Sequence, residues 1–284
     1  MSGGFPGWPL RRDDGLPVVM GVVNVTPDSF SDGGQWFEPS AAIAHGRELR
    51  EQGADILDIG GESTRPGAQR PSLDEELRRV VPVVTALAAD GAMVSVDTMR
   101  ASVAAVALDA GAVVVNDVSG GLADPEMAGV VAAAGVPFIA MHWRGHSVDM
   151  QARATYDDVV ADVCAELAQR AETLVAQGIP ADRLVLDPGF GFAKTAAHNW
   201  SLLRRLDEVI ALGHPVLVGT SRKTFLGRLG VPDGAEPRPP LDRDVQTAAT
   251  SVHAAMMSAW AVRVHHVPST LDALRVAQAI KEAD

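Results

Sequence analysis

The first long apolar stretch of the chain, VVMGVVNVTPDSFSDGG at residues 18–34, decides between the two common classes of α/β fold. Residues 18–24 are rich in Val, as in a buried strand. In a doubly wound, dinucleotide-binding sheet this strand would continue into a G-x-G-x-x-G turn. The text that follows reads NVTPDSFSDGG and lacks that fingerprint. The absence of this motif after the first strand therefore argues against a doubly wound, dinucleotide-binding fold.

Seven further apolar runs follow the first, and Ala-rich amphipathic segments lie between most of them. This alternation is typical of βα units around a parallel sheet, and eight such units can close into a barrel. We predict an α/β fold, a single-domain (β/α)8 TIM barrel over residues 17–284, with a flexible N-terminal extension at residues 1–16. The predicted strands are 18–24, 55–60, 93–97, 113–116, 137–141, 183–187, 216–219 and 261–265, and the clearest helices are 40–52, 74–89 and 101–110.

The composition narrows the partners of the chain. With 284 residues, 47% of them hydrophobic, the chain can bury a large core. A net charge of −12 disfavours nucleic acid and anionic membranes as partners. The N-terminal segment carries Gly and Pro where a signal peptide needs a continuous apolar stretch, so we expect a cytoplasmic protein. The single cysteine, Cys164, is expected to pack in the core.

Polar side chains stand at the C-terminal end of the predicted strands. Barrel enzymes build their active sites from this rim and from the loops that follow it. Any one of these residues could simply cap the next helix, as Asn and Asp often do. Taken together they predict a single site, and they are Asn24, Asp58, Asp97, Asn116, His142, Asp187, Ser221, Arg222, Lys223, Arg263 and His265.

Three loops attract notice. Residues 24–34 and 60–68 combine Gly and Pro with Ser, Thr, Asp or Arg, as in loops that close over a reaction and exclude water, although ordinary turns share this chemistry. Residues 227–244 are rich in Pro and Gly, and we predict a long exposed loop there.

Seven segments in register carry a family resemblance. NVTPDSFSDGG, GGESTRPGA, SVDTMR, VNDVSGG, DPGFGFAK, GTSRKTFLG and RVH occur in this order over nearly the whole chain. Together they resemble the dihydropteroate synthase family. The resemblance implies a transferase that joins 7,8-dihydropterin-6-ylmethyl diphosphate to 4-aminobenzoate in folate biosynthesis. It also implies that these two small molecules are the partners of the chain and that the protein is a homodimer.

The resemblance also implies a role for each matching residue. Asp97, Asn116 and Asp187 would read the donor and acceptor edge of the pterin, with Lys223 on its carbonyl side. A flat heterocycle needs matched polar partners, because unmatched buried polar groups are costly. The residues expected to pack beside the rings, each of which could also be plain core, are Met141 and Phe192.

For the diphosphate, the resemblance implies an anion site at Arg263 and His265, with Asn24 holding Mg2+ against the same oxygens. Residues two apart in a strand share a face, so both cations can point to one ligand. Arg also offers a planar fork for phosphate oxygens. His265 could equally be a structural histidine, and Asn24 could cap a turn.

The second substrate is implied to meet Thr64, Arg65 and Pro66, while Thr224 would hold the 4-aminobenzoate carboxylate at a helix N-terminus. The residues expected to carry catalysis are Asp97, Asp187, Lys223, Arg263 and His265.

Two other functions remain as alternatives. A methyltetrahydrofolate methyltransferase barrel would share the Asp and Asn residues but needs neither GTSRK nor GGESTRPG, and both are present. A non-catalytic pterin-binding relative should have lost Arg65, Lys223 or Asn24, and the chain keeps all three.

One position departs from the family pattern. The family commonly continues RVH with Asp-Val, whereas this chain reads RVHHV and has His266 at that place. Strand alternation predicts that His266 points away from Arg263 and His265. If the two neighbouring histidines interact, the local charge would depend on pH near neutrality.

Overall fold

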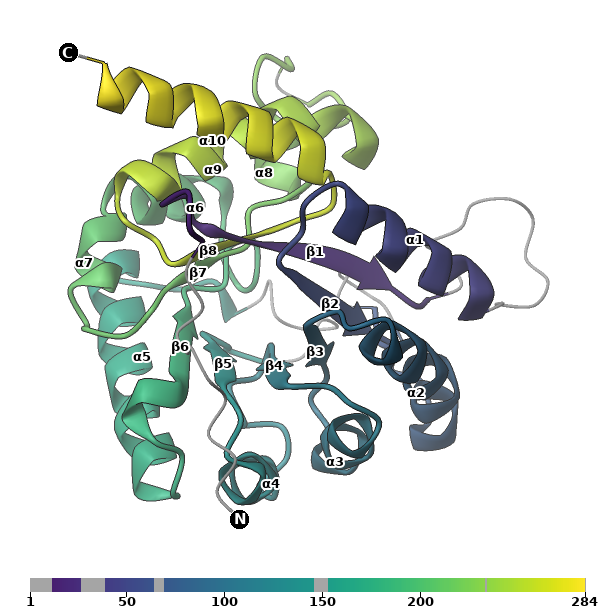
Figure 1. Ribbon diagram of the computed structural model, residues 1–284. Coiled ribbons are helices and arrows are strands. Elements are labelled where there is room, and N and C mark those ends of the chain that lie inside the picture. The colour runs from purple at the N-terminus through teal and green to yellow at the C-terminus, as the bar shows by residue number, and fades with distance from the viewer. Residues whose placement is uncertain (1–11, 27–38, 64–68, 146–152, 233, 284) are drawn as a thin grey trace.

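The computed structural model describes residues 12–26, 39–63, 69–145, 153–232 and 234–283, and its centre is a barrel of parallel strands (Figure 1). The strand order is β6-β5-β4-β3-β2-β1-β8-β7, and a parallel bridge between Leu186 and Val216 joins the two ends of this order. The prediction of a TIM barrel is confirmed. The strands are β1 Val18–Asn24, β2 Ile56–Gly60, β3 Val94–Asp97, β4 Val114–Asp117, β5 Phe138–Met141, β6 Leu184–Asp187, β7 Leu217–Val218 and β8 Ala261–Val264.

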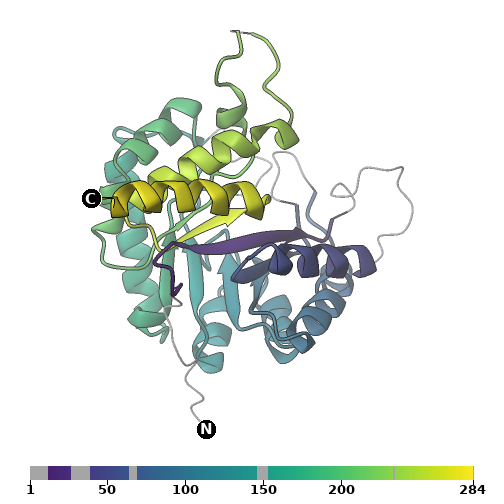
Figure 2. The ribbon, with the colours of Figure 1, turned by 45° about the horizontal axis from the view of Figure 1, so that its top comes forward.

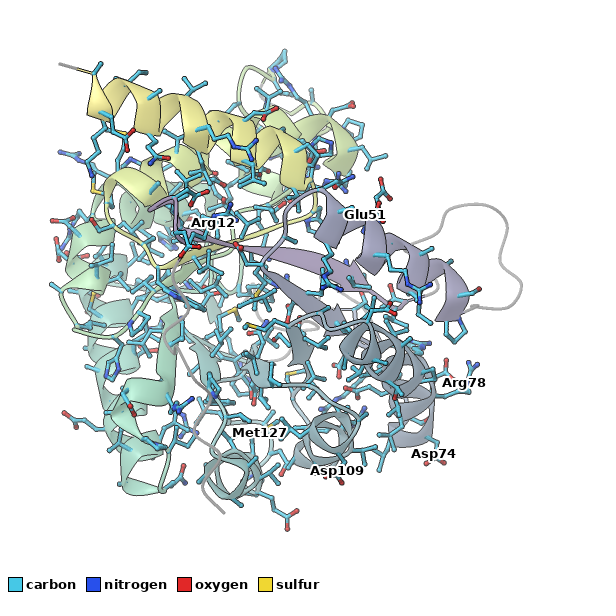
Figure 3. All side chains as sticks on the ribbon, viewed as in Figure 1. Arg12, Glu51, Asp74, Arg78, Asp109 and Met127 are labelled. Atoms are coloured by element: carbon cyan, nitrogen blue, oxygen red, sulfur yellow. The ribbon has the colours of Figure 1, made fainter. Side chains whose placement is uncertain are left out.

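Helices cover the outside of the barrel, and α9 and α10 lie next to each other beside β8 (Figures 1 and 2). The outer faces of α2 and α3 carry exposed charged side chains, among them Asp74, Arg78 and Asp109 (Figure 3). The helices are α1 Pro39–Glu51, α2 Leu73–Ala89, α3 Ala101–Asp109, α4 Met127–Ala134, α5 Val159–Ala176, α6 Ala196–Arg204, α7 Leu206–Ile210, α8 Thr224–Gly227, α9 Asp244–Met256 and α10 Val267–Glu282, with the 3-10 helices η3 Ala181–Arg183 and η4 Pro240–Arg243.

Side-chain oxygens mark where several helices begin. Ser72 caps α2 by accepting from the Glu75 N–H at 3.2 Å, and the Asp158 carboxylate caps α5 in the same way. Such caps satisfy backbone donors that have no partner within the helix. The ends of these elements are thus encoded locally.

Strand register sorts the barrel interior into layers. Alternate residues of each strand point inward, and the inner cluster near the N-terminal end is apolar, with Val18, Met20 and Ile56 among its members. Two residues beyond a member of this cluster, several strands carry a polar side chain, as at Asp58 after Ile56 and Arg263 after Ala261. A larger apolar cluster fills the space between strands and helices. The barrel interior is therefore apolar near the N-terminal ends of the strands and carries polar side chains near their C-terminal ends.

The observed strand and helix bounds agree closely with those expected from the sequence. The first strand agrees at both ends, whereas β7 is only Leu217–Val218 and β8 ends at Val264. Residues 228–232 and 234–239 are mostly exposed, as predicted, but η4 and the buried Arg243 interrupt the expected loop.

The N-terminal segment contacts the bottom of the barrel. Arg12 Nη1 donates to both Asp55 carboxylate oxygens at 2.8 and 2.9 Å, and Leu16 is buried. The predicted domain boundary at residue 17 stays a prediction. Within the described ranges, no helix is long and apolar enough to cross a membrane.

Candidate active site

Polar side chains form the uppermost inward layer of the barrel. The register pairs Asn24 with Gly60, Gly60 with Asp97, and Asp97 with Asn116. On the other side, Met141 pairs with Asp187. These residues come from six different strands, β1 to β6, and each lies at or near the C-terminal end of its strand, which faces one rim because the strands are parallel. The convergence expected from the sequence is thus present in the structure.

Arg263 is the centre of an ionic cluster at this level. Its Nε donates to Asp58 Oδ2 at 2.6 Å, and its Nη2 donates to Asp97 Oδ2 at 2.8 Å. The same Asp58 oxygen accepts from Asn116 Nδ2 at 3.0 Å. Arg263 therefore links three strands, and its Nη1 donates to no group of the described residues.

Burial and opposite charge compete within the ionic cluster. Burial alone would lower the pKa of Arg263, but the carboxylates of Asp58 and Asp97 raise it above its usual value. Burial raises the pKa of Asp97, and the Arg263 guanidinium opposes that shift. The cluster combines a permanent cation with a carboxyl whose charge depends on that cation.

A second group of charges lies on the β6 side. The Gly189 N–H donates to Asp187 Oδ1 at 2.7 Å, and the Lys223 Nζ lies 3.9 Å from the centre of the Phe192 ring. Burial raises the pKa of Asp187, while the Gly189 N–H and the Lys223 ammonium lower it. Burial also lowers the pKa of Lys223 to about 8. An ammonium over an aromatic face is held by the ring quadrupole.

An apolar cluster adjoins these charges. Met99, Val118 and Met141 form it, and Phe192 packs against them. A wall of this kind beside convergent polar groups suits a flat, partly aromatic ligand.

Two glycines allow the β6 loop to approach the site. Gly189 has a φ of +70°, and a Cβ there would lie 2.6 Å from the His142 carbonyl oxygen. Gly191 has a φ of +78°, and a Cβ there would lie 2.9 Å from Lys223 Cδ. Any larger residue would displace the loop or the lysine.

His265 belongs to the opposite edge of the site. Its Nδ1 lies 2.9 Å from Ser221 Oγ, and its backbone N–H donates to the same oxygen at 3.1 Å. Ser221 comes from the turn that carries Lys223, so this contact joins the ends of β7 and β8.

Comparison with known proteins places this geometry in a family. Residues 20–265 match the model of a family described as pterin binding enzyme. The chain belongs to the pterin-binding enzyme family. It is 53% identical over 259 residues to the dihydropteroate synthase of Mycobacterium leprae, covering 91% of each chain.

Solved structures of pterin-binding enzymes support the same assignment. A dihydropteroate synthase of Xanthomonas albilineans with 4-aminobenzoic acid is 46% identical, with a TM-score of 0.87 and 95% of each chain covered. The same enzyme in complex with 7,8-dihydropteroate has a TM-score of 0.84 and is 42% identical, covering 96% of this chain and 97% of the other.

Most of the predicted site residues of this pterin-binding barrel lie together. Asp97, Asn116, Met141, Asp187 and Arg263 point into its upper layers, and Phe192 and Lys223 contact each other beside them. Thr224 is exposed and is the first residue of α8. Thr64, Arg65 and Pro66 lie outside the described residues. The individual roles stay predictions.

Two parts of the site were predicted from the sequence only as single rim residues, Asp58 and His142, without their partners. Asp58 was noted only as a polar residue near a strand end, yet it is fully buried and binds Arg263 and Asn116. An acidic residue between Leu57 and Ile59 in a buried strand was a usable signal, since such a charge needs a partner.

The second part is a buried chain behind Phe192, of which the sequence analysis named only His142. Lys194 Nζ donates to the Phe192 carbonyl at 3.1 Å and lies 3.0 Å from His142 Nδ1, while His142 Nε2 lies 2.9 Å from Glu166 Oε2. Burial lowers the pKa of His142 to about 4 and that of Lys194 to about 7. The neutral imidazole therefore donates to Glu166 and accepts from Lys194.

The departure at His266 has a structural explanation. His266 is exposed and caps α10, accepting at Nδ1 from the Ser269 N–H at 3.3 Å. His266 is thus the N-cap residue of α10, a position where an acidic side chain is common. The imidazole thus turns toward α10.

Proposed function

We propose that this chain is a dihydropteroate synthase, which condenses 7,8-dihydropterin-6-ylmethyl diphosphate with 4-aminobenzoate and releases diphosphate. Its support is the 53% identity to the Mycobacterium leprae enzyme, together with a similar Xanthomonas albilineans structure that holds 7,8-dihydropteroate. The convergence of Asp97, Asn116, Asp187 and Lys223 beside one apolar wall adds a physical reason.

The pterin would lie between the apolar wall and the polar layer. Asp97 and Asp187 would accept from its amino and ring N–H groups, Asn116 would add an amide, and Lys223 would donate to its carbonyl oxygen. The Lys223 ammonium already lies over the Phe192 ring, so it is held in place before the ligand arrives. Preorganised donors and acceptors of this kind lower the cost of binding.

The diphosphate would meet Arg263 and His265. Arg263 Nη1 would donate to the ligand, because Nε and Nη2 already donate to the carboxylates of Asp58 and Asp97. As the bond between the pterin methylene and the diphosphate oxygen breaks, the Arg263 guanidinium and the His265 imidazole would stabilise the charge of the departing diphosphate. Asp97 and Asp187 then stabilise the positive charge left on the pterin. The neutral amine of 4-aminobenzoate attacks the methylene carbon and loses a proton.

Mg2+ is proposed as the cofactor, with Asn24 as its protein ligand. No group of three or more His, Cys, Asp or Glu that could hold a metal occurs among the residues described. The Asn24 amide at the end of β1 fits an ion that is bound mainly by water and substrate phosphates, as Mg2+ commonly is. When bound, Mg2+ would neutralise charge on the diphosphate oxygens.

The test of the proposed function is diphosphate release by the purified chain, measured with each substrate alone and with both, in the presence and absence of Mg2+. We expect release only when the pterin diphosphate, 4-aminobenzoate and Mg2+ are all supplied, together with formation of dihydropteroate. Binding of the pterin without release would instead indicate a non-catalytic pterin-binding protein.

The pH profile gives a further expectation. The pKa of Lys223 is lowered to about 8 by burial, so its ammonium loses a proton as the pH rises through this value. We expect kcat/KM for the pterin diphosphate to fall above about pH 8, because it reports groups of the free enzyme. In Lys223→Arg this alkaline limb should vanish, since a guanidinium stays protonated. An unchanged limb would assign it to another group.

We also propose that the active form is a cytoplasmic homodimer that associates through the late helices. Large exposed apolar side chains support this face, because such patches on soluble proteins mark contacts. Their exposed fractions are 71% at Leu241, 78% at Val245, 70% at Met256, 61% at Val276 and 72% at Ile280, on η4, α9 and α10.

The dimer proposal predicts that Val245→Glu together with Ile280→Glu gives a monomer in sedimentation. A glutamate at the 54% exposed Leu122, which lies between β4 and α4, serves as the control and should leave the mass unchanged. A wild-type chain that sediments as a monomer at micromolar concentration would contradict the proposal.

A further inference from the structure

The turn between β7 and α8 has an unusual backbone. The Lys223 N–H donates to the Thr220 carbonyl at 3.1 Å and closes a four-residue turn. Arg222 occupies the third position with a φ of +57°. Gly or Asn usually takes such a position, because a Cβ is strained there. A strained residue persists only where its surroundings hold it.

Helix α9 and the preceding η4 hold both polar groups of the Arg222 backbone. The Arg222 N–H donates to Thr247 Oγ1 at 3.1 Å, and its carbonyl accepts from Arg243 Nη1 at 2.7 Å. Both Thr247 and Arg243 are buried, with 2% and 6% of their surface exposed. The clamp is therefore part of the packed protein and does not depend on a surface loop.

The side chain of Arg222 adds a third attachment. Its Nε and Nη2 donate to the two Asp244 carboxylate oxygens at 2.7 and 2.8 Å. This is a bidentate pair, the geometry in which an Arg–carboxylate contact is most directional. Asp244 is the first residue of α9, so the ion pair ties the turn to the start of that helix.

The turn sends its two neighbouring side chains to different parts of the site. Ser221 contacts His265, on the side proposed to bind the diphosphate. Lys223 lies over Phe192, on the side proposed to bind the pterin. Arg222 points between them toward α9. The conformation of this one residue thus sets the direction of both neighbours.

We propose that Arg222, Thr247 and Asp244 form a clamp that positions Lys223 and Ser221 for ligand binding. Arg222 is a positioning residue, since it acts through its neighbours. The inference rests on the proposed function where it concerns turnover. The placement of Lys223 can be tested by pterin binding alone, without the reaction.

The sharpest test removes one hydroxyl. Thr247→Val keeps the shape of the side chain but deletes the acceptor for the Arg222 N–H, and Thr247→Ser restores it. Thr173→Val is the matched control, because the Thr173 hydroxyl also donates to the carbonyl four residues earlier, at 2.8 Å, but lies on the exposed face of α5. Thr247 makes that same bond to Arg243 at 2.9 Å.

Binding of 6-hydroxymethylpterin is measured by fluorescence titration for each variant, with the kinetic constants for both substrates. We expect Thr247→Val to weaken pterin binding by about tenfold, the range of a lost hydrogen bond to a strained turn, with Thr247→Ser close to wild type. Since burial lowers the pKa of Lys223, a loosened turn should also move the alkaline limb of binding to higher pH. A defect of stability alone would lower Tm without moving this limb.

A second pair of variants tests the backbone. Arg222→Ala and Arg222→Gly both lose the Asp244 ion pair, but only Gly adopts the left-handed conformation without strain. We expect Arg222→Gly to bind the pterin more tightly than Arg222→Ala. Thr247→Val with wild-type binding and an unmoved limb, or Arg222→Ala equal to wild type, would overturn the clamp. Wild-type protein that binds pterin but releases no diphosphate would overturn the proposed function and leave the clamp to be judged on binding.

Discussion

Replacing Arg263 with methionine is expected to lower kcat/KM for the pterin diphosphate by about 10²- to 10³-fold, the usual cost of removing one preorganised donor to a developing charge. The Arg263 guanidinium has two roles in the ionic cluster. It faces the proposed diphosphate site, and it donates to the Asp97 carboxylate. Its loss removes the charge that stabilises the leaving group and frees the carboxylate that reads the pterin. Steady-state diphosphate release measures the effect.

The same variant should lose stability in a pH-dependent way. Without Arg263, the pKa of Asp97, which burial already raises, rises further. A carboxyl whose pKa is higher in the folded state takes up a proton on folding, so its contribution becomes unfavourable as the pH rises. The difference between wild type and Arg263→Met in the free energy of unfolding should therefore be larger at pH 8 than at pH 6.

Arg275→Met is the matched control, because Arg275 forms an exposed pair with Asp272 on α10. Exposed pairs of this kind contribute little. Wild-type turnover in Arg263→Met would exclude Arg263 from the anion site, whatever its effect on stability.

The alternation of apolar runs with Ala-rich segments was enough to predict the barrel, because each strand is buried on both faces and reads as a continuous apolar stretch. The first strand was predicted with the bounds that the structure shows. Strands with a polar or turning end were less clear. β7 stops at Val218 because the chain enters the clamped turn at Thr220, and that turn depends on bonds to α9.

The sequence predicted that certain side chains lie at the C-terminal rim of the barrel. It did not predict which of them contact one another. The pairing of Arg263 with Asp58 and Asp97 joins residues 205 and 166 positions apart in the chain. It follows from the closure of β8 onto β1, which no local pattern reports. The Lys194, His142 and Glu166 chain was missed for the same reason, since its members come from three elements that adjoin only in the folded barrel.

Replacing Asp58 with alanine is expected to lower the free energy of unfolding by about 3–5 kcal/mol, the cost of removing one partner of a buried ion pair. Asp58 Oδ2 accepts from both Arg263 and Asn116, and its side chain is fully buried. Its removal leaves both donors without that acceptor, so kcat/KM for the pterin diphosphate should also fall. Chemical unfolding and diphosphate release measure the two effects.

Asp55→Ala is the matched control, at the residue that immediately precedes β2. Asp55 pairs with Arg12 at the bottom of the barrel, where side chains serve stability and lie far from the rim. It should lower stability by a smaller amount, because its side chain is 23% exposed, and it should keep wild-type kcat/KM. If both variants kept full activity, Asp58 would be a support of the fold alone. Activity lost only in Asp58→Ala would assign the buried carboxylate that holds Arg263 and Asn116 to the active site, because Asp55 is also paired with an arginine but faces the opposite end of the barrel.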